Sequence, residues 1–360
     1  MNLMTQHDIA TSRLLSQQIN EPSLKSAPEM VAYFGAIQGQ EYAQTKWSLG
    51  LRMPHLKDSD IEKELNEGKI LRTHLLRPTW HFVASGDIRW MLKLTAPRVD
   101  AINSYMYRKM ELDNATFNRC NDIMTQVLEG GKHLTREALS QEFLKNNIEA
   151  ESVRLVCILM KAELEGLICS GARQGNQFTY ALLEERVPPA KEISRDEALA
   201  ELTQRYFLSR GPATAKDFAT WSGLTLTDCK KGIEMTRVNW TEEKIESETY
   251  YFSPKALKKE TNFEQMHLTP IYDEMIMGYK NREALQQIRH AVQPAQRLRF
   301  DNTILFNGQI IGSWRRKIKP KLIELEYEFL QPLNKKQELE FEKAILRFEN
   351  FYGLPVKTIL

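Results

Sequence analysis

Two glutamines, Gln38 and Gln40, lie on either side of Gly39 and are the residues of this chain with the clearest potential for chemistry. Residues two apart point in nearly opposite directions on an α-helix but share a side in an extended or turning segment. We expect the helix predicted for 28–37 to stop at Gly39 with a positive φ. Both amides would then face one cleft; on spacing alone, capping of the helix junction is the commoner role for such amides.

Other catalytic patterns are missing from the sequence. It contains no HExxH, GxSxG or glycine-rich phosphate loop, and its histidines at 55, 74 and 81 have no cysteine near them. These absences disfavour metalloenzymes, serine hydrolases and nucleotide-driven enzymes, and we expect neither a metal nor a cofactor. Adjacent carboxylates such as Asp273 and Glu274 are far more typical of caps and solvated faces than of acid and base pairs.

The charge balance points to local rather than global recognition of an anionic partner. The chain has 49 Lys and Arg against 47 Asp and Glu, which excludes a uniformly basic, histone-like or polybasic membrane-binding protein. Residues 284–321 nevertheless hold eight basic residues against Asp301 alone: Arg289, Arg297, Arg299, Arg315, Arg316, Lys317, Lys319 and Lys321. Residues 314–319 are predicted to be a loop whose side chains reach phosphates, with a merely solvated loop as the alternative.

The elements that must position these residues repeat along the chain. Segments 65–72 and 164–170 each close a helical pattern with Glu-Gly and enter a short β-type run. Helix, glycine stop, strand, turn and strand is the order of a winged helix. Three such units are predicted, with helices at 28–37, 41–53 and 58–66, then 135–144 and 151–165, then 194–209, 214–223 and 225–237, and with the third wing at 239–252.

Beyond Pro254 the pattern becomes β-rich. Apolar runs at 303–306, 309–314 and 321–327 are separated by Asn307-Gly308, a strong two-residue hairpin signal, and by the basic segment. An amphipathic helix at 337–351 closes the chain. The predicted class is therefore α+β, with three tandem winged helix-turn-helix units and an antiparallel C-terminal part, divided at 1–110, 111–190, 191–253 and 254–360.

Length indicates the number of domains, and the cysteines and hydropathy indicate the cellular compartment. A chain of 360 residues is long enough for two to three domains. Cys120, Cys157, Cys169 and Cys229 show no CxxC spacing, which is typical of buried thiols in a reducing compartment. The first twenty residues are polar and no apolar run approaches a membrane span, so we expect a cytoplasmic protein.

An ordered set of motifs resembles the AlkZ/YcaQ-like family of winged-helix DNA glycosylases. The motifs are Ile37–Gln40, Leu71–His74, Arg77–Val83, Arg205–Phe207, Arg210–Thr214, Asp217–Leu224, Tyr272–Met275, Gly278–Arg282 and Ile311–Arg316. The resemblance extends over residues 8–355. One departure is Gly39, where the family usually has an apolar residue, and we expect it to loosen the link between the two glutamines.

The resemblance implies a concave DNA channel, with excision of cationic N7-alkylated purines and, in some members, unhooking of interstrand crosslinks. Gln38 and Gln40 inherit the catalytic role. The expected DNA contacts are Arg72, Arg77, His81, Arg173, Lys280, Arg282, Trp314, Arg315, Arg316 and Lys317. For His81, which lies between two aromatic residues on a predicted strand, a role as a core histidine is the alternative.

Amides suit this chemistry. A cationic purine leaves without a general acid, so the enzyme has mainly to place water and tolerate an oxocarbenium-like sugar. Since no nucleophilic lysine motif is present, we expect a monofunctional glycosylase that acts on double-stranded DNA as a monomer. The alternative from another class is a non-catalytic winged-helix DNA-binding protein or transcription regulator, which would typically form a dimer.

Overall fold

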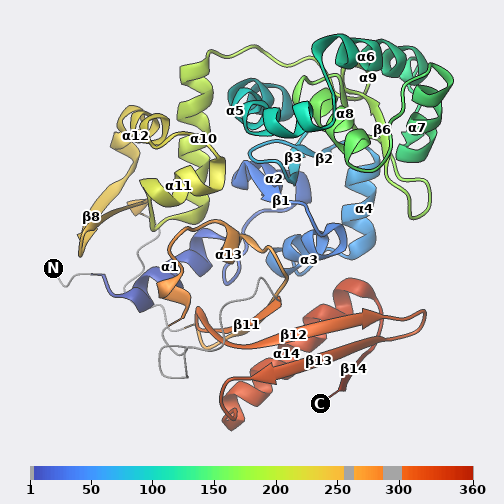
Figure 1. Ribbon diagram of the computed structural model, residues 1–360. Helices are drawn as coiled ribbons and strands as arrows, with labels where there is room; N and C mark the ends of the chain where they lie inside the picture. Colours follow the sequence, from blue (N-terminus) through green and yellow to red (C-terminus); the bar gives the residue numbers. More distant parts are fainter. Residues whose placement is uncertain (1–3, 255–262, 287–301, 360) are drawn as a thin grey trace.

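The computed structural model describes residues 4–254, 263–286 and 302–359. Within these ranges the strands form four sheets, three of them three-stranded and the fourth five-stranded. Figure 1 shows the three helix-rich units with the small sheets above, and the five-stranded sheet with its long helix below. The expectation of a mixed α+β fold is confirmed. No helix in these ranges is both long and apolar enough to cross a bilayer.

The first unit holds the candidate catalytic segment in its sheet. Strand β1 pairs antiparallel with β3, which pairs antiparallel with β2, so β1 is an edge strand. The elements are α1 (Gln6–Ser16), α2 (Ala27–Phe34), β1 (Ala36–Gln38), α3 (Tyr42–Arg52), α4 (Asp58–Asn66), β2 (Ile70–His74) and β3 (Trp80–Ala84).

The second and third units repeat a three-stranded sheet with the orders β4-β6-β5 and β7-β9-β8. Thr135 and Ser194 cap the N-termini of α7 and α10 with their side chains. The elements are α5 (Ile88–Lys109), α6 (Asn114–Leu128), β4 (Leu134–Thr135), α7 (Arg136–Lys145), α8 (Ser152–Leu164), β5 (Ile168–Ser170), β6 (Thr179–Leu182), α9 (Leu183–Arg186), α10 (Arg195–Arg210), β7 (Ala213–Thr214), α11 (Ala215–Ser222), α12 (Leu226–Met235), η1 (Arg237–Asn239), β8 (Thr241–Ile245) and β9 (Glu248–Phe252).

The C-terminal part is a sheet in the order β10-β11-β12-β13-β14, with α14 packed on it. Asn307 and Gly308 both have positive φ, which confirms the predicted hairpin between β11 and β12. The sheet is not wholly antiparallel, because β14 runs parallel to β13. The elements are β10 (Met266–Thr269), α13 (Glu274–Met277), η3 (Glu283–Leu285), β11 (Asn302–Phe306), β12 (Gln309–Ile318), β13 (Ile323–Phe329), α14 (Lys335–Tyr352) and β14 (Val356–Ile359).

One hydrophobic core joins the first unit to the C-terminal sheet. The Trp47 and Trp314 rings both pack edge-on against Phe348 of α14, with centroids 4.8 and 5.2 Å away. Their indole N–H groups donate to backbone oxygens of β10, Leu268 and Thr269, at 2.6 and 3.0 Å. Shared burial of this kind ties α3, the helix that follows the glutamine segment, to a strand 221 positions further along the chain.

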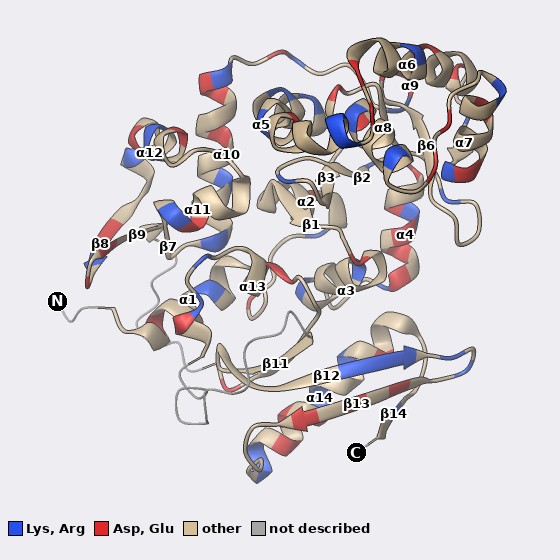
Figure 2. Ribbon diagram, viewed as in Figure 1, with Lys and Arg blue, Asp and Glu red and all other residues tan. Residues whose placement is uncertain are grey.

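Two local predictions were wrong. Helix α2 ends at Phe34, because Gly35 adopts the positive φ of +75° that we expected at Gly39, and residues 36–38 become a strand. The basic segment after Trp314 is not a loop, since β12 continues to Ile318. Arg315 lies opposite Glu326 and Lys317 opposite Glu324, and such pairs of opposite charge favour continued strand pairing. Figure 2 shows the basic stretch of β12 beside acidic positions of β13.

Acidification is expected to destabilise the fold from about pH 6.5 downward. His81 and His267 are completely buried, and the His267 ring has no hydrogen-bond partner among the described residues. Burial, reinforced by Arg77 near His81 and Arg347 near His267, lowers both pKa values well below 6.5. Below that pH the unfolded chain binds protons that the folded chain does not, so each histidine removes up to about 1.4 kcal/mol of stability per pH unit.

Urea unfolding of the wild type and of His267→Leu between pH 5.0 and 7.5 measures this effect. The variant should lose roughly half of the histidine-dependent slope, while its pH dependence above pH 7 should match that of the wild type. Equal slopes in the two proteins below pH 6.5 would contradict the assignment of a neutral His267.

Candidate active site

Gln38 is the last residue of β1 and lies directly opposite His81 of β3. The pairing continues one residue further, because the Gly39 N–H donates to the Trp80 carbonyl at 2.7 Å. A Cβ at position 39 would lie 3.1 Å from the His81 carbonyl carbon, so the absent side chain permits this close approach. Gly39 thus belongs to a tight strand pair, and our expectation of a loose link between the glutamines was wrong.

The Gln38 side chain is buried and its carboxamide oxygen is held in place. Its Oε1 accepts a hydrogen bond from Arg77 Nη2 at 2.5 Å. The backbone N–H of Gln38 donates to Glu274 Oε1 at 2.9 Å, and its backbone oxygen accepts from Thr45 Oγ1 at 2.9 Å. Backbone and side chain are therefore fixed by three different segments of the chain.

Gln40 offers an unused acceptor. Its Oε1 is buried and has no hydrogen-bond partner among residues 4–254, 263–286 and 302–359, although the side chain as a whole is partly exposed. A buried acceptor left without a partner costs about 1–3 kcal/mol, and such an atom is suited to accept from a bound molecule. The pair therefore combines one carbonyl held by Arg77 with one buried carbonyl that has no partner among the described residues.

Arg72 and Arg77 hold the glutamine segment. Arg72 Nε donates to the Gly39 carbonyl at 2.9 Å, and its guanidinium lies over the Trp80 and Phe178 rings, 4.2 and 4.5 Å from their centroids. Arg77 Nη1 also donates to the Thr220 carbonyl of α11 at 3.4 Å. Burial lowers the pKa of both guanidinium groups without removing their charge. Arg72 and Arg77, two of the residues predicted to contact DNA, thus lie at the candidate site.

Two other predicted DNA contacts are core residues. The Trp314 side chain is 1% exposed, and His81 is wholly buried beside Gln38. Neither side chain has surface to offer to DNA in this structure, which corrects the sequence prediction for both. The physical reason is the register of their strands, which turns both residues toward the interior.

The remaining predicted contacts fall into three places. Arg173 reaches the first unit, where its Nη1 lies 3.3 Å from Glu62 Oε1 and its guanidinium 4.9 Å from the Tyr42 ring. Lys280 is exposed, and its backbone N–H donates to Asp217 Oδ1 at 2.8 Å. Arg282 is half-buried and its Nε donates to the Ile276 carbonyl at 2.9 Å. Arg173 thus lies beside Tyr42, two residues after Gln40, and Arg282 lies close enough to Arg77 to help lower the pKa of that guanidinium, which burial lowers most.

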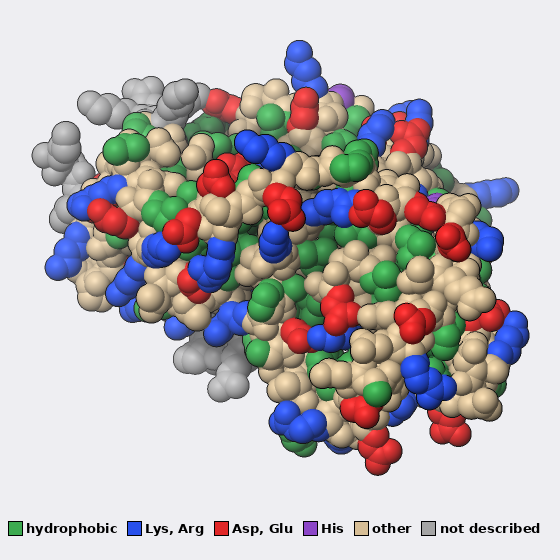
Figure 3. Space-filling model, turned by 90° about the horizontal axis from the view of Figure 1, so that it is seen from above, with side chains coloured by type: hydrophobic (Ala, Val, Ile, Leu, Met, Phe, Trp, Pro, Cys, Tyr) green, Lys and Arg blue, Asp and Glu red, His purple; other side chains and the backbone are tan. Residues whose placement is uncertain are grey.

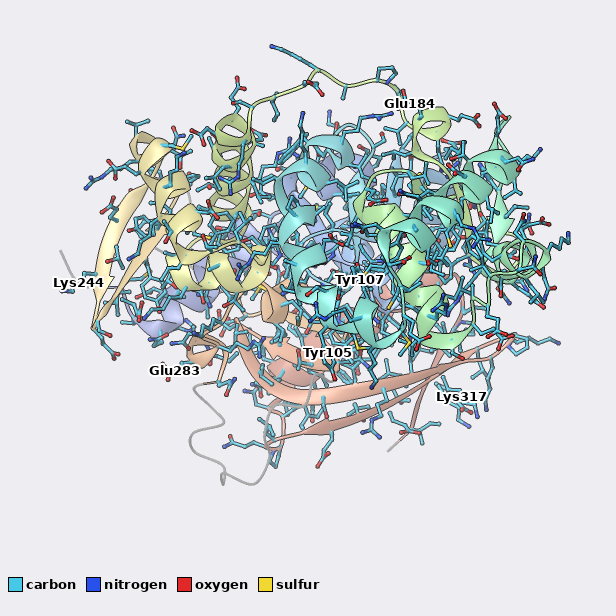
Figure 4. All side chains as sticks on the ribbon, turned by 45° about the horizontal axis from the view of Figure 1, so that its top comes forward. Tyr105, Tyr107, Glu184, Lys244, Glu283 and Lys317 are labelled. Carbon is cyan, nitrogen blue, oxygen red and sulfur yellow. The ribbon has the colours of Figure 1, made fainter. Side chains whose placement is uncertain are left out.

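On β12, the side chains of Arg315 and Lys317 are exposed, whereas Arg316 packs over Tyr352, 4.9 Å from the ring centroid, and donates to its hydroxyl. Figure 4 places Lys317 toward the free end of the β12–β13 hairpin. The predicted residues Arg289, Arg297 and Arg299 lie outside the described residues. Seen from above, basic and acidic side chains mix over the drawn face, so that face has no single-sign basic surface (Figure 3).

Sequence reasoning missed two buried carboxylates, of which Glu274 accepts the backbone N–H of Gln38. Asp273 and Glu274, interpreted as solvated caps, are both fully buried, and each pairs with a buried arginine, Arg52 and Arg210. Asp273 does cap α13, because its Oδ1 accepts the backbone N–H of Met275, but its carboxylate also binds Arg52. The available signal was the occurrence of Arg210 and of residues 272–275 in the ordered motif set. Among the described residues, no group of three His, Cys, Asp or Glu side chains could hold a metal ion.

Known proteins resemble this chain over most of its length. The family model described as DNA glycosylase AlkZ-like matches residues 31–351. The interstrand DNA cross-link repair glycosylase of Streptomyces sahachiroi is 22% identical over 370 aligned residues, which cover 96% of this chain and 97% of that protein. The solved structure of the DNA glycosylase AlkZ from the same organism superposes with a TM-score of 0.79 at 17% identity, and covers 99% of this chain and 100% of that chain.

Proposed function

We propose, from the premise that this chain belongs to the AlkZ-like DNA glycosylase family, that it excises cationic N7-alkylated purines from double-stranded DNA. The chain is a DNA glycosylase; the substrate is the part that we propose. The observation that supports it best is the unpartnered carbonyl acceptor of Gln40 beside the fixed carboxamide of Gln38. Two neutral acceptors without a strong base suit a leaving group that is already cationic.

The reaction needs little beyond placement. Water attacks C1′ of the lesion while the bond from C1′ to N9 breaks, and the bonding electron pair neutralises the purine. In this proposal, Gln40 Oε1 accepts a hydrogen bond from the attacking water, and the proton that the water loses passes to solvent. Since the nucleophile is water rather than lysine, the DNA strand stays intact after base release.

A gel assay on a duplex with one N7-methylguanine tests the substrate. Purified protein should produce strand cleavage only after alkali, and the Gln38→Ala/Gln40→Ala double variant should bind the same duplex without releasing the base. If wild-type protein binds the duplex as a dimer and releases no base, the second function, a winged-helix DNA-binding regulator, replaces the first.

We also propose how the enzyme holds DNA. We interpret the three helix and sheet units as tandem winged helices with boundaries at 1–110, 111–190, 191–253 and 254–360, arranged in a monomer around the DNA. We propose crosslink unhooking as well, because the Streptomyces relative is named for interstrand DNA cross-link repair.

The proposed location is the cytoplasm. The four cysteines are free and buried, as is typical of proteins in a reducing compartment.

Neutralising the exposed basic residues of β12 should weaken DNA binding without regard to sequence. The Arg315→Ala/Lys317→Ala variant should lower the slope of log affinity against log salt by about two units, and adding Arg316→Ala by up to about three. Fluorescence anisotropy between 50 and 250 mM salt measures the slope. Arg316→Ala alone should lower the slope by less than about one unit, because its guanidinium packs over Tyr352 and donates to its hydroxyl. An unchanged slope in the double variant would mean that these side chains do not contact DNA and only pair with the acidic residues of β13.

A further inference from the structure

We propose that the buried ion pair between Arg210 and Glu274 is a positioning device that aims Gln38. The inference rests on the proposed catalytic role of Gln38. Arg210 is the last residue of α10, and Glu274 is the first residue of α13. Neither side chain has more than a trace of exposed surface, so the pair acts within the protein and not on DNA directly.

The pair occupies the outer edge of β1. The inner edge of this strand pairs with β3, which leaves the outer backbone groups without a neighbouring strand. Arg210 Nη1 and Nη2 donate to the carbonyls of Phe34 and Ala36 at 2.8 and 2.9 Å. Glu274 Oε1 accepts the backbone N–H of Gln38 at 2.9 Å. Two side chains therefore replace a missing strand along the segment that ends at Gln38.

The geometry of the pair is itself over-determined. Glu274 Oε2 accepts from Arg210 Nε at 3.0 Å, from Arg210 Nη2 at 2.7 Å and from the indole N–H of Trp221 at 3.0 Å. The guanidinium also lies over the Trp221 ring, 4.1 Å from its centroid. Charged side chains that are buried and held by several hydrogen bonds have little freedom to change position.

Such rigidity matters for placement more than for binding. Gln38 ends a three-residue strand, and the direction of its side chain follows the backbone that Glu274 holds. A displacement of about 1 Å in a catalytic group can cost on the order of 10²-fold in rate. Loss of the Glu274 contact should therefore slow excision while leaving DNA affinity, which depends on surface cations, almost unchanged.

The chain contains a matched control pair. Arg52 and Asp273 are equally buried, and Asp273 precedes Glu274 in the sequence. Arg52 Nη1 and Nη2 bind the two Asp273 oxygens at 2.8 and 2.9 Å, and within the described residues no hydrogen bond of this pair reaches β1. A loss of stability alone should affect both pairs alike, whereas a loss of positioning should follow only the change at Glu274.

Single-turnover excision of N7-methylguanine by the full chain, as a function of enzyme concentration, tests the proposal. Glu274→Gln should lower the saturating rate constant by about 10-fold or more and change the half-saturating concentration by less than about 2-fold. Asp273→Asn should leave both within about 2-fold of wild type, despite a lower melting temperature. Should Glu274→Gln fail to fold, Arg210→Lys takes its place, because an ammonium has three donors where the Arg210 guanidinium makes five hydrogen bonds.

A double-mutant cycle with Gln38→Ala decides whether Glu274 acts through Gln38. In the Gln38→Ala background, Glu274→Gln should slow excision by less than about 3-fold, since there is no amide left to aim. An equal loss in both backgrounds, or equal losses for Glu274→Gln and Asp273→Asn, would overturn the positioning role and leave the proposed function standing. Absence of base release by the wild type would remove the proposed function, and this inference with it.

Discussion

Replacing Gln38 or Gln40 with alanine should reduce the excision rate by on the order of 10²-fold or more, with DNA affinity nearly unchanged. Each change removes a neutral carbonyl acceptor that the proposed transition state uses, and neither removes a charge. The two residues should differ in detail. Gln38→Ala also takes a partner from Arg77, whereas Gln40→Ala removes an atom that has no partner among the described residues.

Glutamate variants separate electrostatics from geometry. Gln40→Glu keeps the shape and adds negative charge, so it should retain part of the rate if the amide acts by attracting the cationic sugar and orienting water. Gln174→Ala, in the exposed turn before β6, is a matched glutamine control and should excise at the wild-type rate. Wild-type rates in stably folded Gln38→Ala and Gln40→Ala proteins would end the catalytic assignment. A large fall in melting temperature would instead favour a purely structural role for the two glutamines.

The largest expected effect on stability is at Asp273. Asp273→Ala should lower the free energy of unfolding by about 3–5 kcal/mol, because it leaves the buried Arg52 guanidinium without its counter-charge. The groups that would still accept from Arg52 are neutral, the oxygens of Gln17 and Ser48. Urea unfolding at pH 7 measures the loss. The Arg52→Met/Asp273→Leu double variant should recover most of it, since no buried charge is then unpaired.

The pH dependence of this loss has a definite sign. Burial by itself would raise the Asp273 pKa, but the Arg52 charge and hydrogen bonds from Arg52, Ser48 and the Met275 N–H together hold it below its ordinary 3.8. A carboxylate with a depressed folded pKa stabilises the fold fully above the unfolded pKa and loses that contribution as pH falls through the folded value. The difference between wild type and Asp273→Ala should therefore be constant from pH 7 to pH 5 and shrink below about pH 4. A difference that grows on acidification would contradict the ionised pair.

Local signals predicted much of the fold. Asn307-Gly308 specified its hairpin because both residues adopt positive φ readily, and Gly353, just after the helix predicted for 337–351, ends α14 with a φ of 63°. The start of α14 was placed too late, since Asn334 caps it. Gly35 was overlooked as a helix stop because Gly39, four residues on, offered the same intrinsic freedom. Only strand pairing with β3 distinguishes the two positions.

The sequence allowed the two glutamines of the candidate site to be predicted, but not the side chains that hold them in place. Gln38 and Gln40 are separated by a spacing that sequence can recognise. Their partners come from remote segments, however, and no local pattern shows that Glu274 is bound by Arg210 and Trp221. Propensity rules assign adjacent acids to the surface, since isolated buried charges are costly. A buried arginine from another unit overrides that rule and is visible only after the chain has folded.

The outer edge of β1 also sets when the enzyme can become active during its synthesis. The contacts from Ala36 to Arg210 and from Gln38 to Glu274 join residues 174 and 236 positions apart. Contacts of such range form late, after the intervening chain has been made and its loops closed. A nascent chain that has reached the end of the third unit already has both glutamines but lacks the carboxylate that orients the first. Competence to cut glycosidic bonds is thus delayed until the C-terminal part emerges, and fragments released earlier would lack both this carboxylate and the basic residues of β12.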